Sequence, residues 1–333
     1  MRPDDRPDAE PLLDVRDLKV SFDTAHGRVQ AVAGISWTLS PGETLGIIGE
    51  SGSGKSVGLE AIMGLIKSPP GRISGQALFD GQDIMNLPER QRRALRGEEI
   101  AMIFQDAMSA LNPSLTVGSQ ISEVYRLRRR CSRKDADDKA IELMDRVKIP
   151  SAWNRLNDYP HEFSGGMCQR VMIATALALE PRILIADEPT TALDVTVQRQ
   201  IMALLTGLKE ELGMALVLVT HDLGVVAEVV DRAMVMYAGR IVESADVETL
   251  FGAPAHPYTR GLIRSMPKIG AGAEALSAID GTPPAAGHIP AGCAFHPRCP
   301  DVMPQCRSDR PKLLPVTTEH HSACHLTGEP PNA

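Results

Sequence analysis

Eight consecutive residues of the 333-residue chain have the types and spacing that bind phosphate groups. They match the pattern G-x-x-x-x-G-K-S/T in full and are Gly49, Glu50, Ser51, Gly52, Ser53, Gly54, Lys55 and Ser56. In such a loop the glycines let backbone N–H groups turn toward phosphate oxygens, the lysine reaches the β- and γ-phosphates, and the last hydroxyl is a ligand of Mg²⁺. An apolar run precedes the loop and a helical stretch follows it, which favours a nucleotide site over a Gly/Ser-rich surface loop.

Two carboxylates follow another apolar run of strand length, residues 182–186. Asp187 and Glu188 come directly after it, and a buried strand holds such side chains rigidly at its C-terminal end. One carboxylate can hold Mg²⁺, directly or through water, and the next can polarise an attacking water molecule. A solvated strand end is the alternative for this pair alone. The phosphate loop in the same chain favours hydrolysis.

Four of the six cysteines lie in a proline-rich segment near the end of the chain, at Cys293, Cys299, Cys306 and Cys324. Such a segment has few residues that can form a hydrophobic core, so it is expected to need a stabilising cross-link. In a reducing cytosol this cross-link is expected to be a metal rather than a disulfide. The spacing lacks the paired C-x₂-C of common zinc sites, although His320, His321 and His325 flank the last cysteine. Four thiolates also suit a 4Fe–4S cluster, so the residues alone leave iron and zinc open.

The elements that must position these groups follow an α/β pattern. Nearly continuous apolar runs at 44–48, 100–104, 183–186, 216–220 and 233–237 are separated by helical stretches. This pattern predicts strands buried on both faces of a largely parallel sheet. Residues 119–160 show no strand pattern and predict a helical insert. Proline and glycine become dense after residue 253, which predicts a domain boundary near Gly252.

Composition excludes some classes of function. The net charge of −7 and an aromatic content of 4% disfavour a surface that coats nucleic acid or stacks its bases. No apolar run is long enough to span a bilayer. The first ten residues are polar, which disfavours a signal peptide and predicts folding in the cytosol.

Further motifs, in the right order, resemble those of ATP-binding cassette (ABC) proteins. Residues 163–167, Phe-Ser-Gly-Gly-Met, look like the family's signature motif. Gln105 is similar to its Q-loop glutamine and residues 192–194 to its D-loop. His221 looks like its switch histidine, and Phe22 stands where the family places an aromatic ring against adenine. The resemblance implies a P-loop NTPase cassette over 11–252, with a RecA-like core, an antiparallel β subdomain and a helical subdomain at about 119–180.

The resemblance also implies a mechanism and roles for residues. Cassettes of this family form head-to-tail dimers that enclose two ATP molecules, so Ser164, Gly165 and Gly166 are expected at ATP bound by the partner. Asp194, in the D-loop, is expected among the nucleotide-binding residues. Glu188 is expected to be the general base, with His221 near the γ-phosphate and the attacking water. Ser56, Gln105 and Asp187 are expected around Mg²⁺.

Several segments resemble the ATPases of oligopeptide, dipeptide and nickel importers more closely. They include residues 104–106, 111–113 and 159–167, and the segment Ala-His-Pro-Tyr-Thr at 255–259. Ala107 departs from an expected proline, and Cys168 departs from an expected arginine. The resemblance implies a C-terminal extension at 253–329, short disordered tails at 1–10 and 330–333, and a 4Fe–4S cluster on the four cysteines.

The same resemblance implies the partners. These are two membrane permease subunits, a second ATPase subunit that is expected to be a paralogue, and indirectly an extracytoplasmic solute-binding protein. The protein is then expected at the cytoplasmic face of the membrane, with the permease seated between the Gln105 region and the helical insert. Nickel chelates or another solute are the alternative cargo. Two further hypotheses are a soluble ABC ATPase acting on ribosomes or nucleic acid, and a redox switch centred on the cysteines.

Overall fold

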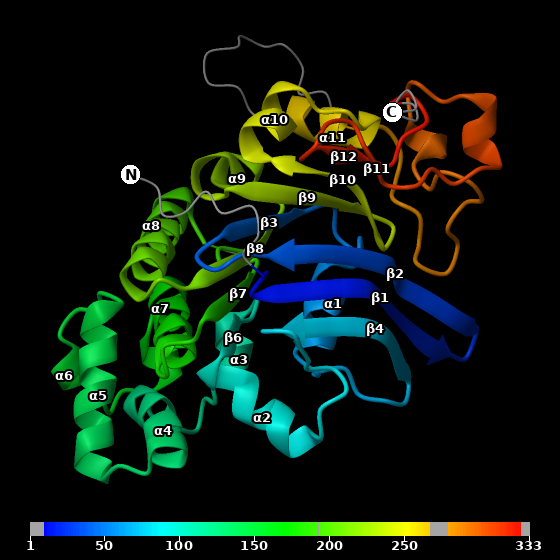
Figure 1. The fold of residues 1–333 in the computed structure, drawn as a ribbon. Helices are drawn as coiled ribbons and strands as arrows, with labels where there is room; N and C mark the ends of the chain where they lie inside the picture. The colour runs from blue at the N-terminus through cyan, green and yellow to red at the C-terminus, as the bar shows by residue number, and fades with distance from the viewer. Residues whose placement is uncertain (1–9, 192, 267–278, 328–333) are drawn as a thin grey trace. The chain divides into compact units, whose positions relative to one another are not determined.

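The computed structural model describes residues 10–191, 193–266 and 279–327 (Figure 1). The predicted tails at 1–10 and 330–333 lie outside this range except for Glu10. The chain forms two compact units. The first contains residues up to 40, residues 44–87 and the chain from 219 onward, and the second contains residues 41–43 and 88–218.

The first unit contains an antiparallel sheet with the strand order β2-β1-β4-β5. Its strands are β1 (Leu13–Thr24), β2 (Gly27–Leu39), β4 (Gly71–Phe79) and β5 (Gln82–Asp83). Buried side chains alternate with exposed ones along β1 and β2, as in a sheet with one solvated face. Helix α1 (Lys55–Ile62) packs against β1 and β2. This is the antiparallel β subdomain that the resemblance implied.

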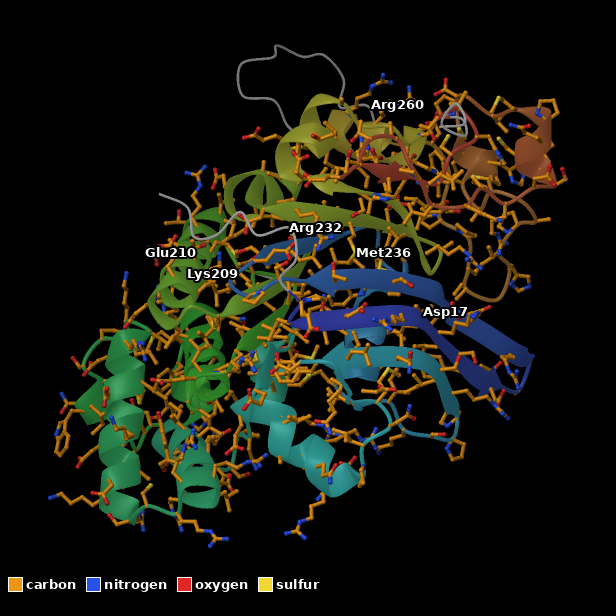
Figure 2. The ribbon with its side chains drawn as sticks, in the orientation of Figure 1. Asp17, Lys209, Glu210, Arg232, Met236 and Arg260 are labelled. Atoms are coloured by element: carbon orange, nitrogen blue, oxygen red, sulfur yellow. The ribbon has the colours of Figure 1, made fainter. Side chains whose placement is uncertain are left out.

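The first unit also contains strands in the order β11-β12-β10-β9-β3. These are β3 (Thr44–Ile48), β9 (Arg232–Tyr237), β10 (Arg240–Asp246), β11 (Leu314–Pro315) and β12 (His321–Ser322). Strand β3 is parallel to β9 and buried along its whole length. Arg232, labelled in Figure 2, donates a 2.5 Å hydrogen bond to the Thr38 carbonyl and so ties β9 to the end of β2.

Short helices complete the first unit. They are α9 (Leu223–Val229), α10 (Val247–Gly252), α11 (Pro257–Arg264) and the 3₁₀ turns η2 (His296–Arg298) and η3 (Pro304–Arg307). Asp222, Asp246 and His256 cap the first turns of α9, α10 and α11 through their side chains. Such caps satisfy backbone N–H groups that have no partner inside the helix.

The second unit combines parallel strands with most of the helices. Strand β6 (Ile100–Ile103) pairs in parallel with β7 (Ile183–Asp187), and the chain leaves this unit within β8 (Ala215–Thr220). The helices are α2 (Glu89–Glu98), α3 (Ala107–Ala110), α4 (Val117–Arg129), α5 (Arg133–Arg146), α6 (Ala152–Arg155), the 3₁₀ turn η1 (Pro160–Glu162), α7 (Gly165–Leu177) and α8 (Val195–Leu212). Helices α4 to α6 occupy the segment predicted as a helical insert.

The separate cysteine-rich C-terminal domain expected from the sequence is not supported. Strand β12 pairs with β10 through Glu243 and Ser322, so the end of the chain extends a sheet of the first unit. The fully buried Glu243 carboxylate accepts hydrogen bonds from the backbone N–H groups of Ala255 and His256, at 2.6 and 2.9 Å, and lies 2.8 Å from His320 Nε2. Strands of two residues carry no periodic signal, which is why the sequence did not reveal this pairing.

Candidate functional site

The phosphate loop follows β3, and two of its glycines are required by close approach to neighbouring backbone. A Cβ atom at Gly49 would lie 2.4 Å from the carbonyl oxygen of Met236, which is labelled on β9 in Figure 2. A Cβ at Gly54 would lie 2.5 Å from the Ala31 carbonyl oxygen, and Gly54 has a φ of +100°. Any side chain at these positions would displace the loop from the strands that support it.

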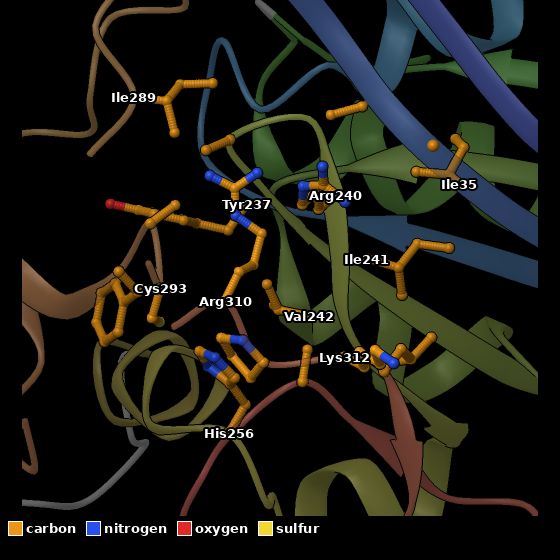
Figure 3. Close-up of a pocket in the computed structure, with 18 of the residues that line it drawn as sticks. Ile35, Tyr237, Arg240, Ile241, Val242, His256, Ile289, Cys293, Arg310 and Lys312 are labelled. Carbon is orange, nitrogen blue, oxygen red and sulfur yellow. The ribbon is translucent and has the colours of Figure 1, made fainter. Parts of the chain in front are cut away.

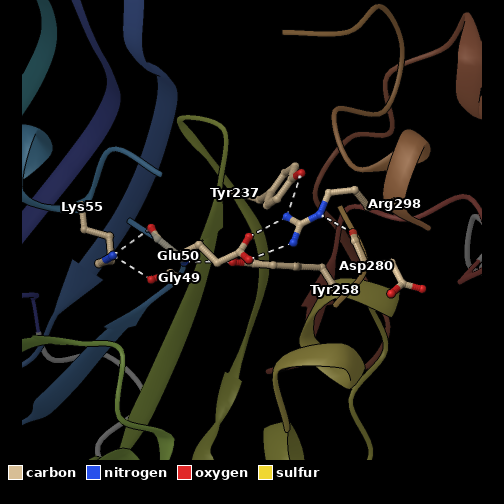
Figure 4. A network of polar contacts seen from close by, with 7 residues as sticks. All are labelled: Gly49, Glu50, Lys55, Tyr237, Tyr258, Asp280 and Arg298. Atoms are coloured by element: carbon tan, nitrogen blue, oxygen red, sulfur yellow. Dashed lines mark hydrogen bonds and ion pairs between the residues drawn. The ribbon is translucent and has the colours of Figure 1, made fainter. Parts of the chain in front are cut away.

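Lys55 holds the loop from within. Its ammonium group is buried and donates hydrogen bonds to the carbonyl oxygens of Gly49 at 2.7 Å and Glu50 at 3.1 Å (Figure 4). Helix α1 begins at Lys55, and no side chain caps its N-terminus because the capping residue is Gly54. The helix N-terminus and the ammonium group therefore fit the negative charge of a phosphate, and Ser56 lies in the first turn.

The two carboxylates occupy different environments in the second unit. Asp187 ends β7 and is 5% exposed. Glu188 follows it with a φ of +45°, a left-handed backbone conformation that is uncommon for residues other than glycine. Its Oε2 accepts hydrogen bonds from Gln105 Nε2 and from Thr191 Oγ1, each 2.9 Å long. Gln105 lies just beyond the end of β6, the strand that pairs with β7. The parallel pair thus brings the predicted Q-loop residue to the predicted base.

The predicted signature motif forms the start of α7. Ser164 is the N-cap and accepts a 3.4 Å hydrogen bond from the Met167 backbone N–H. Ser164 and Gly165 are exposed, whereas a Cβ at Gly166 would lie 2.7 Å from Val197 Cγ1 on α8. Cys168 is fully buried and its thiol lies 3.4 Å from the Pro160 carbonyl oxygen, so this departure from the family pattern is a core residue.

The remaining predicted residues take clear local positions. Asp194 caps α8, accepting hydrogen bonds from the Thr196 and Val197 backbone N–H groups at 3.0 and 2.9 Å. Ala192 of the predicted D-loop lies outside the described residues. His221 is exposed just after β8, and the half-buried Phe22 lies on β1 opposite Val29 and Gly71. Ala107 is the first residue of α3, a position at which proline is also well tolerated.

The predicted site residues are divided between the two units. The first unit holds Phe22, the loop from Gly49 to Ser56, and His221. The second holds Gln105, Ser164, Gly165, Gly166, Asp187, Glu188 and Asp194.

The prediction of a metal cluster at Cys293, Cys299, Cys306 and Cys324 is not supported. Within residues 10–191, 193–266 and 279–327, no group of three or more Cys, His, Asp or Glu side chains is arranged to hold a metal ion. Burial, and to a smaller degree the charges of neighbouring thiols, raises the pKa of Cys293 and of Cys324, and raises that of Cys299 to about 11. Among the described residues these four thiols form no such group.

The zinc alternative is not supported either, because the described His320, His321 and His325 form no metal-holding group with the cysteines. His320 Nε2 lies 2.8 Å from the buried Glu243 carboxylate, and His325 Nε2 lies 3.0 Å from the Asp309 carbonyl oxygen.

A cavity of about 640 Å³ lies in the first unit, away from the phosphate loop (Figure 3). Residues of β2, of the β9–β10 hairpin and of the C-terminal extension line it, and none of residues 49–56 is among them. Its charged lining residues are Arg240, Arg310 and Lys312. Burial, and then the charge of Arg310, lowers the pKa of Arg240. This cavity is therefore not part of the phosphate loop.

Sequence reasoning missed two sets of residues at this site. Thr191 contacts the Glu188 carboxylate, and its position three residues after Glu188 was the available signal. Tyr258 and Arg298 contact Glu50 of the phosphate loop from 208 and 248 residues away. No short-range pattern could have shown this contact.

Comparisons with known proteins identify the family of the chain. Residues 32–191 match the family described as "ABC transporter", and residues 242–306 match "Oligopeptide/dipeptide transporter, C-terminal region". The Oligopeptide transport ATP-binding protein OppD of Escherichia coli (strain K12) is 50% identical over 95% of this chain and 93% of its own. OppD of Bacillus subtilis (strain 168) is 50% identical over 93% of this chain and 87% of its own.

Solved structures show the same fold. The dimeric post-hydrolysis state of the ATP-binding cassette MJ0796 bound to ADP and Pi aligns with a TM-score of 0.64 and 28% identity. The alignment covers 71% of this chain and 98% of that one. The structure of cbiO1 from Clostridium perfringens aligns with a TM-score of 0.62 and 29% identity, over 74% of this chain and 92% of that one.

Proposed function

Because the chain belongs to the family of ABC transporter ATP-binding proteins, we propose that it is the ATP-hydrolysing subunit of an importer for peptides. The observation that carries the proposal is the presence of an uncapped helix N-terminus beside Lys55 in one unit and of a hydrogen-bonded Glu188 in the other. Relatives that are 50% identical over nearly their whole length are named for oligopeptide transport, and this supports peptides as the cargo. Nickel chelates are the less favoured cargo.

In the proposed reaction the first unit binds the phosphates. Lys55 and the backbone N–H groups at the start of α1 neutralise and orient the β- and γ-phosphates of ATP. In this unit Ser56 would hold Mg²⁺, which neutralises charge on the phosphates when bound. In the second unit Asp187 and Gln105 carry oxygen atoms of the kind that Mg²⁺ prefers. Phe22 offers a ring for adenine.

The second unit supplies the proton chemistry. Glu188 takes the proton of the attacking water as general base. Gln105 and Thr191 orient its carboxylate, since each donates a hydrogen bond to Oε2. His221 is assigned to the γ-phosphate and the water. Because Ser164 and Gly165 are exposed at the N-terminus of α7, they suit ATP held by a partner cassette. Gly166 and Asp194 are also assigned to nucleotide binding.

We assign attachment to a membrane to other subunits. No described helix combines the length and the apolar character needed to cross a bilayer. In the second unit, Phe104, Met108 and Leu115 flank Gln105 and are 41%, 50% and 41% exposed. Exposed apolar side chains concentrated in one short segment suit a protein partner. We assign this segment to permease subunits at the cytoplasmic face of the membrane.

Uptake by cells tests the function. A strain whose own copy carries Glu188→Gln should lose uptake of labelled di- or oligopeptides while keeping uptake of nickel chelates. The matched control is Glu211→Gln, which alters an exposed ion pair with Arg146 and should leave uptake unchanged. Loss of nickel uptake alone would instead assign the protein to the alternative cargo.

Co-purification tests the partners. The full-length protein extracted in detergent should bring with it integral membrane subunits and a second cassette. Met108→Asp should lose the membrane subunits and keep ATP binding, whereas Leu326→Asp, at another exposed apolar residue, should keep both. Recovery of ribosomes in place of membrane subunits would contradict the proposal and favour a soluble ATPase.

A further inference from the structure

The side chain of Glu50 points out of the phosphate loop and into the C-terminal extension (Figure 4). Its two carboxylate oxygens accept hydrogen bonds from the two terminal nitrogens of Arg298, at 2.6 and 2.9 Å. Such a paired contact between a guanidinium group and a carboxylate fixes orientation as well as distance, and it is stronger than a contact between neutral groups. The second residue of the loop is therefore anchored to a residue 248 positions away.

Arg298 is itself held on every side. Its side chain is 5% exposed, and its Nε donates a 2.9 Å hydrogen bond to the Asp280 carbonyl oxygen. The guanidinium carbon lies 5.9 Å from the ring centroids of both Tyr237 and Phe295. Its hydrogen bond to Glu50 raises the pKa of Arg298 further, so the group stays charged. Because the arginine is immobilised, it can restrain the loop rather than follow it.

The backbone of Glu50 is held as well. Its N–H donates a 2.9 Å hydrogen bond to the hydroxyl of Tyr258, a fully buried residue on α11. Burial raises the pKa of Tyr258, so the hydroxyl that accepts this bond stays neutral. The ring packs against Tyr237 at 4.7 Å and against Phe295 at 5.3 Å between centroids. The extension thus contacts both the main chain and the side chain of one loop residue.

This anchoring bears on the phosphate-binding atoms. The carbonyl oxygen of Glu50 also accepts a hydrogen bond from Lys55, so restraint of Glu50 restrains the acceptor that positions the lysine. Three of the eight loop residues are glycines, and a glycine-rich segment loses much conformational entropy when it orders around a ligand. A loop that is ordered before binding avoids part of this loss and binds more tightly.

We propose that Arg298 and Tyr258 are positioning residues through which the C-terminal extension sets the affinity of the phosphate loop for ATP. The proposal deepens the proposed function and rests on it. Both residues contact Glu50, and they act on the loop through it. The extension is then part of the nucleotide site.

The test measures MgATP binding and steady-state hydrolysis by the full-length protein in its transporter complex. Arg298→Gln, Glu50→Gln and Tyr258→Phe should each weaken MgATP binding and raise KM by about tenfold, with kcat changed far less. Amide hydrogen exchange in residues 49–56 should become faster in all three variants. The double variant Glu50→Gln with Arg298→Gln should bind MgATP no more weakly than either single variant. The reason is that all three lose the same contact, the one between Glu50 and Arg298.

Arg260→Gln is the matched control. It removes an ion pair to Asp301, 2.9 Å long and half-exposed, from the same extension, and it should leave KM unchanged. If the variants lower the melting temperature but keep the KM and loop exchange of the unchanged protein, the contacts are structural only and the inference is wrong. If the unchanged protein itself binds no MgATP, the proposed function fails first.

Discussion

Gln105 and Glu188 are hydrogen-bonded at 2.9 Å although 83 residues separate them. The contact arises because β6 and β7 are parallel neighbours, with Ile103 opposite Ala186, and both residues lie just beyond the ends of these strands. Glu188 Oε2 accepts this hydrogen bond and a second one from Thr191 Oγ1, so two neutral donors fix the carboxylate in one orientation.

Replacing the proposed base removes catalysis and keeps binding. Glu188→Gln should lower kcat by about 100-fold or more, because an amide cannot take a proton from water. The amide oxygen can still accept from Gln105 and Thr191, so ATP binding should persist and the ATP-bound dimer should accumulate. Phosphate release and size-exclusion chromatography with ATP measure the two effects. Turnover at the normal rate would remove Glu188 from this role.

Removing one of the two donors should have a smaller effect. Thr191→Val keeps the shape of the side chain and loses the hydroxyl, and should lower kcat by about fivefold with KM unchanged. Thr206→Val is the matched control, since its hydroxyl donates only to the Met202 carbonyl oxygen within α8. Equal losses in both variants would indicate a general effect of removing a threonine.

Two glycines of the second unit should respond in opposite ways to alanine. Gly166→Ala should destabilise the protein by about 1–3 kcal/mol, because the new Cβ would lie 2.7 Å from Val197 Cγ1. Gly207→Ala should stabilise it by about 0.5–1 kcal/mol, since Gly207 lies inside α8 and its Cβ would have no heavy atom within 4 Å. Thermal unfolding measures both free energies. Adding Val197→Ala should recover much of the first loss, and no recovery would show that the contact is not its cause.

His256 should make stability depend on pH. Burial, and then the charge of Arg260, lowers the pKa of His256 from 6.5 to about 3. Between these values the unfolded chain binds a proton that the native protein does not. Stability should therefore fall as pH decreases below about 6.5, by up to about 1.4 kcal/mol per pH unit.

Denaturant unfolding between pH 7 and pH 4 tests this effect. His256→Asn can still cap α11 by accepting from the Tyr258 N–H, as the ring does at 3.0 Å, but it does not titrate. Its stability should depend less steeply on pH than that of the unchanged protein. His26→Asn, at an exposed turn, should keep the original dependence. The same slope in all three proteins would contradict the assignment.

Short-range patterns in the sequence indicated candidate residues for the site, but they could not indicate the long-range contacts of those residues. The phosphate loop, Asp187 and Glu188 followed from fixed spacings next to apolar strands, and ordered motifs placed Gln105. The contact of Thr191 with Glu188 and that of Arg298 with Glu50 depend on side-chain directions that no period reveals.

The C-terminal extension was the least predictable part. Four cysteines in a proline-rich segment suggested a separate, metal-stapled domain. The C-terminal extension is instead attached to strands β9 and β10 by the buried residues Phe295 and Tyr258 and by the Glu243–His320 pair. These buried residues are far apart in the sequence, so their contacts with the strands can be identified only from the folded structure.

Because β12 pairs with β10, the end of the chain protects a sheet edge. A protein shortened to end before Leu314 would leave the N–H and C=O groups of β10 open to solvent and Glu243 buried without its imidazole partner. An unpaired strand edge is a template for strands of other molecules. Loss of these last residues should therefore appear as aggregation of the ATPase before it appears as loss of nucleotide chemistry.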